Sequence, residues 1–214
     1  MADYQNSINI ACAFAKKWEG LASKSTDSLK YFSNTSSLDP STVIYPYKDT
    51  SNGYSIGWGS FTANNSDGSN DLVGTTITKS QADAIMLAEM TVKESDIRSQ
   101  ITANLNDYQY AAILDYVYNA GEGALQYNGL INTINSGGDV PTALKSCAIT
   151  INNGSSVSSG LVNRRIDEGL LWNGSEDSLY SMYLRNADTI NNTGLALIGV
   201  GAFIFIYVKY FKNK

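Results

Sequence analysis

The sequence predicts a mostly helical α+β domain that is followed by one C-terminal transmembrane helix. Two β-prone runs flank an Asn-Gly pair near the front of the chain, and apolar residues at helical spacing occupy most of the remainder as far as Trp172. A short hairpin followed by a run of helices is typical of the α+β class. The chain has 214 residues, of which 43% are hydrophobic, so it is long enough for one domain with a substantial core and an additional segment.

The first predicted helix lies near the N-terminus and ends before Gly20. Residues 1–9 contain no positively charged stretch, so the sequence predicts no secretory signal peptide. Apolar side chains three or four positions apart lie on one face of a helix. The residues that form this face are Ile8, Ala11, Cys12, Ala15 and Trp18.

A polar segment separates this helix from a predicted β-hairpin. Residues 23–41 are rich in Ser, Thr and Asp and contain Asp39-Pro40, so we interpret them as an inserted loop. The pair Asn52-Gly53 lies between β-prone residues 43–47 and 54–61. An Asn-Gly pair in this setting is a strong signal for a hairpin.

Five helices are predicted after the hairpin. The first begins at Thr78, with Gln81 in the reciprocal capping position, and extends to a break near Asn106. The second, residues 108–118, is apolar on almost every side, as expected of a central buried helix. The last three cover Leu125 to Ile134, Pro141 to Ile149 and Gly160 to Trp172.

The composition changes abruptly after Asp188. Residues 189–208 carry no charge and would form a helix of about 30 Å, near the thickness of a bilayer core, although the strictly apolar part would reach only about 22 Å. A helix buried in a soluble core or an oligomer is the alternative, which the absence of a polar face disfavours. The predicted divisions are a domain at residues 1–185, a linker at 186–192, a transmembrane anchor at 193–208 and a basic tail at 209–214.

Composition limits the chemistry that this chain can perform. The sequence has no histidine, which excludes Ser/His/Asp and Cys/His triads and every His-containing zinc site. Cys12 and Cys147 lie among apolar neighbours, so we expect two buried free thiols and no disulfide. We expect neither a metal nor a cofactor. The net charge of −5 argues against nucleic acid as a partner.

Two acidic residues are the candidates for acid–base chemistry. Glu19 lies at the C-terminal end of the first helix, where the helix dipole and apolar packing disfavour the anion, as a general acid requires. Asp49 begins the hairpin turn and Ser55 follows on the next strand. Taken singly, Glu19 is interpreted as an ordinary surface residue, Asp49 as a turn residue and Ser55 as a strand residue. Facing each other across a groove, the two carboxylates would flank a glycosidic bond, one protonating the leaving oxygen and one activating a water.

The segments around these residues resemble the phage-type lysozymes, the endolysin muramidases of glycoside hydrolase family 24. The similarity is carried by Trp18-Glu19-Gly20 and by residues 47–59, YKDTSNGYSIGWG. Later stretches that resemble the family are residues 105–109, 118–125 and 160–168. The resemblance covers residues 8–172 in the family's order and implies a lysozyme-like domain with a small β-hairpin lobe.

Carried over by position, the resemblance implies a role for each candidate. Glu19 would be the general acid, Asp49 would orient the attacking water or stabilise the developing oxocarbenium charge, and Ser55 would hold that water. This sequence departs from the family in three ways. The family usually has Thr at position 55 and His at position 60, which is Ser60 here, and residues 23–41 lengthen the interval between the two carboxylates to 30 positions.

Further residues are candidates for substrate contact. Tyr47, Tyr54 and Trp58 either stack on sugar faces or pack the hairpin, and the sequence does not separate these readings. Asn119 is a substrate contact or, as we prefer, part of a helix stop at Asn119-Ala120-Gly121. We expect the arginines of the late helix to pair with an acid such as Glu168 and not with peptidoglycan.

Together with the predicted anchor, the resemblance implies a membrane-anchored peptidoglycan hydrolase. It would cleave the β-1,4 bond between N-acetylmuramic acid and N-acetylglucosamine in phage entry or host lysis. The expected partners are peptidoglycan, a lipid bilayer through the C-terminal helix and, in a particle, other virion proteins. The three lysines after the helix predict that the C-terminus lies on the cytoplasmic side of the membrane. The expected location is a single-pass anchor in a virion membrane or in the host inner membrane. The rivals are a lytic transglycosylase and a non-catalytic wall-binding membrane protein on a lysozyme scaffold.

Overall fold

The computed structural model describes residues 2–23, 31–32, 35–49, 52–147, 149–151 and 156–174. The predicted linker, anchor and tail, residues 186–214, lie outside these ranges, as does part of the predicted inserted loop. Within the described part of the chain, no helix is both long enough and apolar enough to cross a bilayer.

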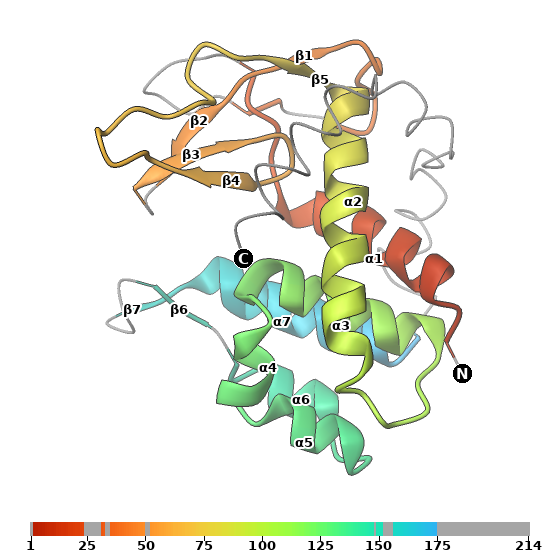
Figure 1. Cartoon of the computed structure of the whole chain (residues 1–214). Coiled ribbons are helices and arrows are strands. Elements are labelled where there is room, and N and C mark those ends of the chain that lie inside the picture. Colours follow the sequence, from red (N-terminus) through yellow and green to blue (C-terminus); the bar gives the residue numbers. More distant parts are fainter. Residues whose placement is uncertain are drawn as a thin grey trace. The chain divides into compact units, whose positions relative to one another are not determined.

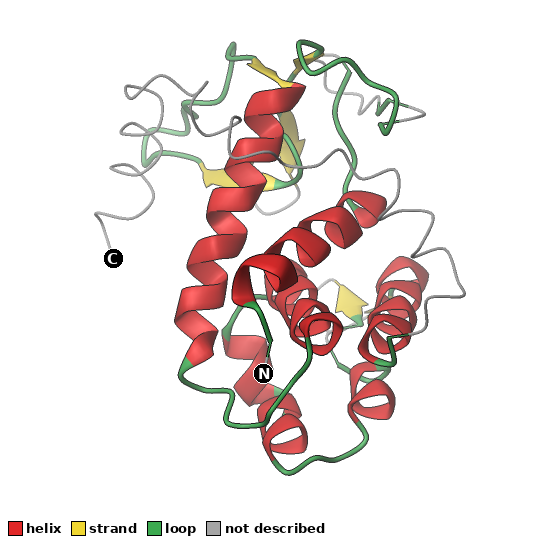
Figure 2. Ribbon diagram, turned by 90° about the vertical axis from the view of Figure 1, so that its right-hand side faces the viewer, coloured by secondary structure: helices red, strands yellow, loops and turns green. Residues whose placement is uncertain are grey.

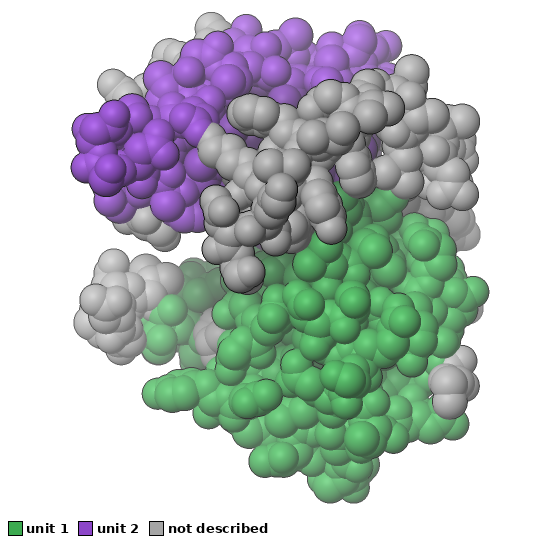
Figure 3. All heavy atoms as spheres, viewed as in Figure 1, with its two compact units in different colours: residues 1–18, 87–186 green, residues 19–86, 187–214 purple. Residues whose placement is uncertain are grey.

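The described residues fall into two compact units, coloured separately in Figure 3. Unit 1 takes its described residues from the ranges 1–18 and 87–186, and unit 2 takes its described residues from 19–86. Helix α2 (Lys79–Arg98) passes from one unit to the other along the chain.

Unit 1 is helical, and α3 (Asp107–Ala120) lies at its centre. Figure 1 shows α3 between α1 (Tyr4–Trp18) and α7 (Ser159–Trp172), and it packs against both helices. Residues 110–117 of α3 are all buried, which confirms the prediction of a central buried helix. Cys12 on α1 and Cys147 are both buried and are not joined in a disulfide, as predicted.

The two ends of α3 are fixed by its own sequence. The Asn106 side chain accepts a hydrogen bond from the Gln109 N–H at 2.9 Å, and the Gln109 side chain accepts one from the Asn106 N–H at 3.0 Å. At the other end Gly121 adopts a φ of 82° and its N–H donates to the Val117 carbonyl at 2.9 Å. The predicted helix stop at Gly121 is therefore confirmed.

Helix α2 is shorter than predicted. It ends at Arg98 and not near Asn106. The Asn135 side chain accepts from the Thr102 N–H and donates to the Gln100 carbonyl, both at 2.8 Å, so these backbone groups are satisfied without continuing the helix. Leu105 is still buried, which explains why its spacing looked helical.

The later helices are also more broken than the sequence predicted. The single helix expected over residues 125–134 is split by Gly129, which adopts a φ of 67°. The helix expected over residues 141–149 ends at Leu144, and a two-stranded sheet that the sequence did not predict follows it. Figure 2 shows the short helices of this part of the chain. The elements are α4 (Gly123–Tyr127), α5 (Leu130–Asn135), α6 (Val140–Leu144), β6 (Thr150–Ile151) and β7 (Ser156–Val157).

A buried cluster of charged groups joins α3 to α7. Arg164 makes two hydrogen bonds with Asp115, at 2.8 and 3.0 Å. Arg165 donates to Glu168 at 2.5 Å and to the amide oxygen of Asn119 at 2.9 Å. Burial, reinforced by the neighbouring Asp115, raises the pKa of Glu168 well above its ordinary value. The expectation that these arginines pair with acids is confirmed.

Unit 2 contains a three-stranded antiparallel sheet in the order β2-β3-β4. Its strands are β2 (Tyr47–Asp49), β3 (Gly53–Ile56) and β4 (Ser60–Ala63), and Asn52 in the turn has a φ of 57°. The predicted hairpin around Asn52-Gly53 is therefore confirmed. Tyr47 pairs with Ser55, and Ser55 pairs with Phe61, so these three side chains share one face of the sheet.

The prediction that residues 43–47 form one hairpin strand is wrong. Strand β1 (Val43–Ile44) pairs instead with β5 (Ile77–Thr78), immediately before α2. This pairing joins residues more than 30 positions apart in the sequence, so local spacing could not predict it. The predicted capping box at the start of α2 is confirmed, because Thr78 and Gln81 exchange side-chain hydrogen bonds with each other's backbone.

Candidate active site

The two candidate carboxylates both belong to unit 2. Glu19 follows directly after α1, and Asp49 is the last residue of β2. The turn of residues 57–59 brings backbone close to Glu19, since a Cβ added to Gly59 would lie 3.3 Å from the Glu19 Oε2. Gly59 has a φ of 101°, which side chains rarely tolerate. Glycine at this position therefore permits both the turn and the close approach to the carboxylate.

Asp49 is positioned by the strand beside it. The Ser55 hydroxyl donates to the Asp49 Oδ2 at 3.1 Å, and Ser55 is 1% exposed. Because Tyr47 and Ser55 are register partners, the hydroxyl lies on the same face of the sheet as the Asp49 carboxylate. This contact fixes the orientation of Asp49.

Two tyrosines lie close to both carboxylates. The rings of Tyr31 and Tyr47 meet edge to face, with centroids 5.9 Å apart and an interplanar angle of 71°. Burial and the negative charges of Glu19 and Asp49 raise the pKa of Tyr31. Burial, the Tyr31 hydroxyl and the same two carboxylates raise the pKa of Tyr47, while a hydrogen bond to Ser55 acts in the opposite direction. Residues 30 positions apart in the sequence thus converge on one pair of rings.

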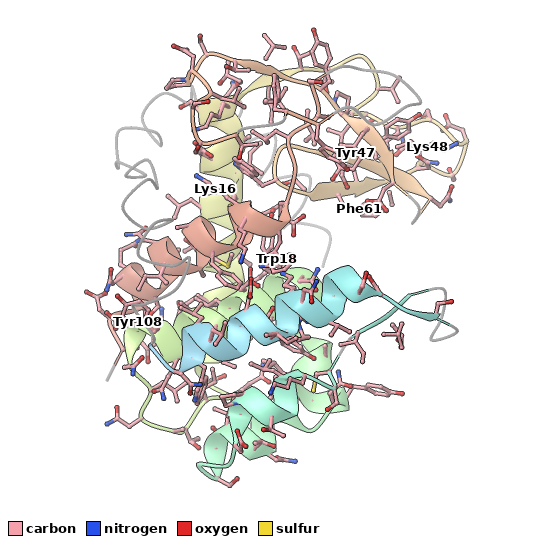
Figure 4. The ribbon with its side chains drawn as sticks, turned by 180° about the vertical axis from the view of Figure 1, so that it is seen from behind. Lys16, Trp18, Tyr47, Lys48, Phe61 and Tyr108 are labelled. Atoms are coloured by element: carbon pink, nitrogen blue, oxygen red, sulfur yellow. The ribbon has the colours of Figure 1, made fainter. Side chains whose placement is uncertain are left out.

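The structure separates the predicted substrate-contact residues. Tyr47 lies with the carboxylates, and Figure 4 shows it on the three-stranded sheet with Phe61 and Lys48. Tyr54 pairs with Lys48, so it lies on the opposite face of the sheet from Tyr47 and Asp49. Asn119 belongs to unit 1, where its amide oxygen accepts from Arg165.

Trp58 is packed inside unit 2 and does not offer a ring face to solvent. It is 2% exposed, and its indole N–H donates to the Asp83 Oδ1 at 2.7 Å. The Lys79 ammonium donates to the other oxygen of Asp83 at 3.1 Å. This Trp58–Asp83–Lys79 network ties the turn of residues 57–59 to the first turns of α2.

Tyr31 and Phe61 also lie at this site, and the sequence did not predict either residue there. Tyr31 lies in the polar segment that we interpreted as an inserted loop, and nothing in its local sequence signals a functional position. Phe61 follows from the strand register, which places it opposite Ser55. Among the described residues, no group of three or more His, Cys, Asp or Glu side chains could hold a metal ion.

Solved structures with the same arrangement of elements are lysozymes and endolysins. The endolysin of Escherichia coli O157:H7 phage FAHEc1 matches with a TM-score of 0.57 and 22% identity, over 76% of this chain and 90% of that one. P22 lysozyme matches with a TM-score of 0.54 and 20% identity, over 76% of this chain and 94% of that one. The muramidase domain of SpmX from Asticaccaulis excentricus has a TM-score of 0.57 and 18% identity, over 76% and 93% of the two chains. The fold is therefore lysozyme-like.

The family is established by sequence. The phage lysozyme family model matches residues 41–168, so this chain belongs to the phage lysozyme family. The endolysin of Bacillus phage PZA is 28% identical over 131 residues, which cover 60% of this chain and 47% of that protein. This chain thus spans about half the length of that relative. The resemblance seen in the sequence is confirmed, and the matched family range contains Asp49 and Ser55 but begins after Glu19 and Tyr31.

Proposed function

We propose that this chain is a muramidase, a glycoside hydrolase that cleaves the β-1,4 bond between N-acetylmuramic acid and N-acetylglucosamine in peptidoglycan. The observation that supports this proposal most directly is a chain of contacts within unit 2. The ring of Tyr31 packs on Gly20, next to Glu19, and meets the ring of Tyr47, whose register partner Ser55 donates to Asp49. Membership of the phage lysozyme family supports it independently. The Bacillus phage relative is named an endolysin, which agrees with this activity.

Each residue has a chemical task in this proposal. Cleavage of a glycosidic bond requires a proton on the leaving oxygen and stabilisation of positive charge on the sugar ring. The Glu19 carboxyl donates the proton, and the Asp49 carboxylate stabilises the oxocarbenium-like ring and directs the water that completes hydrolysis. Ser55 holds Asp49 through its 3.1 Å hydrogen bond and offers its oxygen to the same water. The water adds across the broken bond, so one new hydroxyl forms on each product.

Replacement of the proposed acid tests the activity. Glu19→Gln should lower the rate of peptidoglycan hydrolysis by at least about 10²-fold, because an amide cannot donate the proton, and should leave binding to the wall intact. Turbidity clearing and sedimentation with purified walls measure the two quantities. Glu122→Gln, at the N-terminal boundary of α4, is the matched control and should keep full activity. Unchanged clearing by Glu19→Gln would remove Glu19 from the mechanism and would leave the wall-binding scaffold as the function.

A lytic transglycosylase is the enzymatic alternative. Such an enzyme needs one catalytic acid and leaves an anhydromuramic end, whereas hydrolysis leaves a reducing end. The presence of Asp49, oriented by Ser55, favours hydrolysis because a second carboxylate is required for it. Mass spectrometry of digested peptidoglycan distinguishes the two products. Anhydromuramic ends from the purified protein would overturn the assignment as a hydrolase.

The proposal includes membrane attachment through residues 193–208. It rests on the uncharged run of the sequence and on the three lysines that follow it. The full chain expressed in bacteria should sediment with membranes and resist extraction at alkaline pH, and a chain ending at residue 185 should be released. Recovery of both forms in the soluble fraction would exclude an anchor. Detection of the protein in purified virions would support a role in entry, and detection only in host membranes late in infection would support lysis.

A further inference from the structure

The segment of chain between Glu19 and Asp49 brings the aromatic ring of Tyr31 close to the backbone that follows Glu19. The backbone of Tyr31 forms an antiparallel bridge with Ala22, and the Phe32 N–H donates to the Leu21 carbonyl at 3.0 Å. Ala22 and Leu21 follow Glu19 by only two or three positions. The backbone pairing therefore holds Tyr31 next to the segment that directly follows Glu19.

The ring of Tyr31 packs against Gly20, the residue that directly follows Glu19. A Cβ at Gly20 would lie 2.3 Å from a ring carbon of Tyr31, so the ring takes the space that any side chain at position 20 would need. On another side the ring meets Tyr47 edge to face. These contacts leave 47% of Tyr31 exposed to solvent. Tyr31 is thus half-exposed, and its ring is held in place from two directions.

Such a ring suits one class of ligand. Sugar rings carry C–H groups on their faces, and these pack on the electron-rich face of an aromatic side chain, while a phenol hydroxyl bonds to sugar hydroxyl and acetamido groups. The neighbouring carboxylates disfavour an anionic ligand at this place. A neutral sugar ring is therefore the ligand that matches the apolar face, the hydroxyl and the local charge.

Tyr31 lies outside the part of the chain that matches the phage lysozyme family model, which begins at residue 41. We propose that Tyr31 is a substrate-contacting residue contributed by the inserted segment, and that with Tyr47 it binds the face of a neutral sugar ring beside Glu19 and Asp49. The inference rests on the proposed muramidase activity and adds to it a determinant of glycan affinity that this chain's own insertion supplies.

Binding measured without turnover tests the inference. In a Glu19→Gln background, Tyr31→Ala should weaken binding of soluble, uncrosslinked peptidoglycan strands by about tenfold, measured by calorimetry, which is about 1.4 kcal/mol. With Glu19 intact, the same substitution should raise KM by a similar factor and change kcat little. Tyr31→Phe should retain most of the affinity. Tyr127→Ala, which removes a tyrosine that is 91% exposed on α4, is the matched control and should bind like its parent.

The outcomes separate this inference from the proposed function. If the wild-type chain cleaves peptidoglycan and Tyr31→Ala binds the strands as tightly as its parent, the inference is overturned and the muramidase assignment stands. If the wild-type chain neither binds nor cleaves, the proposed function itself fails. Should Tyr31→Ala not fold, Tyr31→Trp in the Glu19→Gln background decides. When peptidoglycan strands are added, the tryptophan fluorescence of this variant should change more than that of the Glu19→Gln parent. An identical change in the two proteins would overturn the inference.

Discussion

Two glycines determine how closely other groups approach Glu19. At Gly20 the ring of Tyr31 fills the space of a side chain, and at Gly59 the Glu19 carboxylate does so. Both contacts are possible because glycine has no side chain at these positions. At the scale of single residues, the environment of the proposed acid is therefore set by backbone that carries no side chain.

Gly59→Ala should impair activity beyond its effect on stability. The φ of 101° makes any side chain strained, at a cost of about 1–3 kcal/mol, and the new Cβ would press on the Glu19 Oε2 at 3.3 Å. Thermal unfolding measures the strain, and turbidity clearing measures the displaced carboxylate. Gly68→Ala is the matched control, because Gly68 has a φ of 81° but no atom within 4 Å of an added Cβ. Equal loss of activity in the two folded variants would contradict a contact with Glu19.

Ser55→Ala should reduce kcat more than it raises KM. The substitution removes the donor to Asp49 at a site that is 1% exposed, so the carboxylate loses a fixed orientation. We expect a decrease in kcat of about tenfold or more, measured on soluble glycan strands. Ser55→Thr keeps the hydroxyl and should retain most of the activity. A Ser55→Ala variant with normal kcat would show that Asp49 needs no such support.

At the scale of elements, the Trp58–Asp83–Lys79 network connects the turn of residues 57–59 to α2. The Asp83 carboxylate accepts hydrogen bonds from the Trp58 indole N–H and from the Lys79 ammonium. Because Lys79 is only 3% exposed, Asp83 also compensates the charge of a buried lysine. The Cβ of Ala82 is 3.1 Å from the position of a Cβ at Gly57, so the turn also packs tightly on the helix. The network thereby supports the turn that carries Gly59.

Asp83→Asn should destabilise the protein by about 3–5 kcal/mol, because the buried Lys79 ammonium loses the negative charge of a carboxylate that it contacts at 3.1 Å. Chemical denaturation measures the change in the free energy of unfolding. Lys79→Met combined with Asp83→Asn removes both charges and should recover part of the loss, as expected for coupled residues. Additive losses in the double variant would show that the two side chains are not coupled.

At the scale of the whole molecule, the net charge of −5 gives no general attraction to an anionic wall. In the proposed muramidase, recognition of peptidoglycan would then depend on local contacts such as those around Tyr31 and Tyr47. The predicted anchor at residues 193–208 would supply proximity to the wall in place of electrostatic attraction, because tethering raises the local concentration of the enzyme at the membrane surface.

Raising the ionic strength from about 10 to 150 mM should therefore not weaken binding to purified walls. Salt screens repulsion between like charges over about a Debye length, so binding should stay constant or improve. Sedimentation with walls at several salt concentrations measures this, and soluble oligomers of N-acetylglucosamine, which carry no charge, serve as the control. A loss of wall binding with added salt would indicate a cationic docking surface that the composition does not predict.

Features that depend on neighbours along the chain follow directly from the amino-acid sequence. Capping residues at Thr78 and Asn106 fix helix starts, Gly121 fixes a helix end, and Asn52-Gly53 fixes the hairpin turn, because each acts on backbone within a few positions. The resemblance of residues 47–59 to the family identified Asp49 and Ser55, which the structure joins by a hydrogen bond.

Features that depend on distant partners are established only when the chain folds. The pairing of β1 with β5, the end of α2 at Arg98, the burial of Trp58 against Asp83 and the return of Tyr31 to Glu19 all join segments that are well separated in the sequence or set by side chains from other elements. Local propensity cannot choose among such partners, because the free energy that selects them comes from burial and hydrogen bonding in the folded chain. For this protein, Glu19 and Asp49 could be identified as candidates from the sequence, whereas the tyrosines that lie near both of them are evident only in the folded structure.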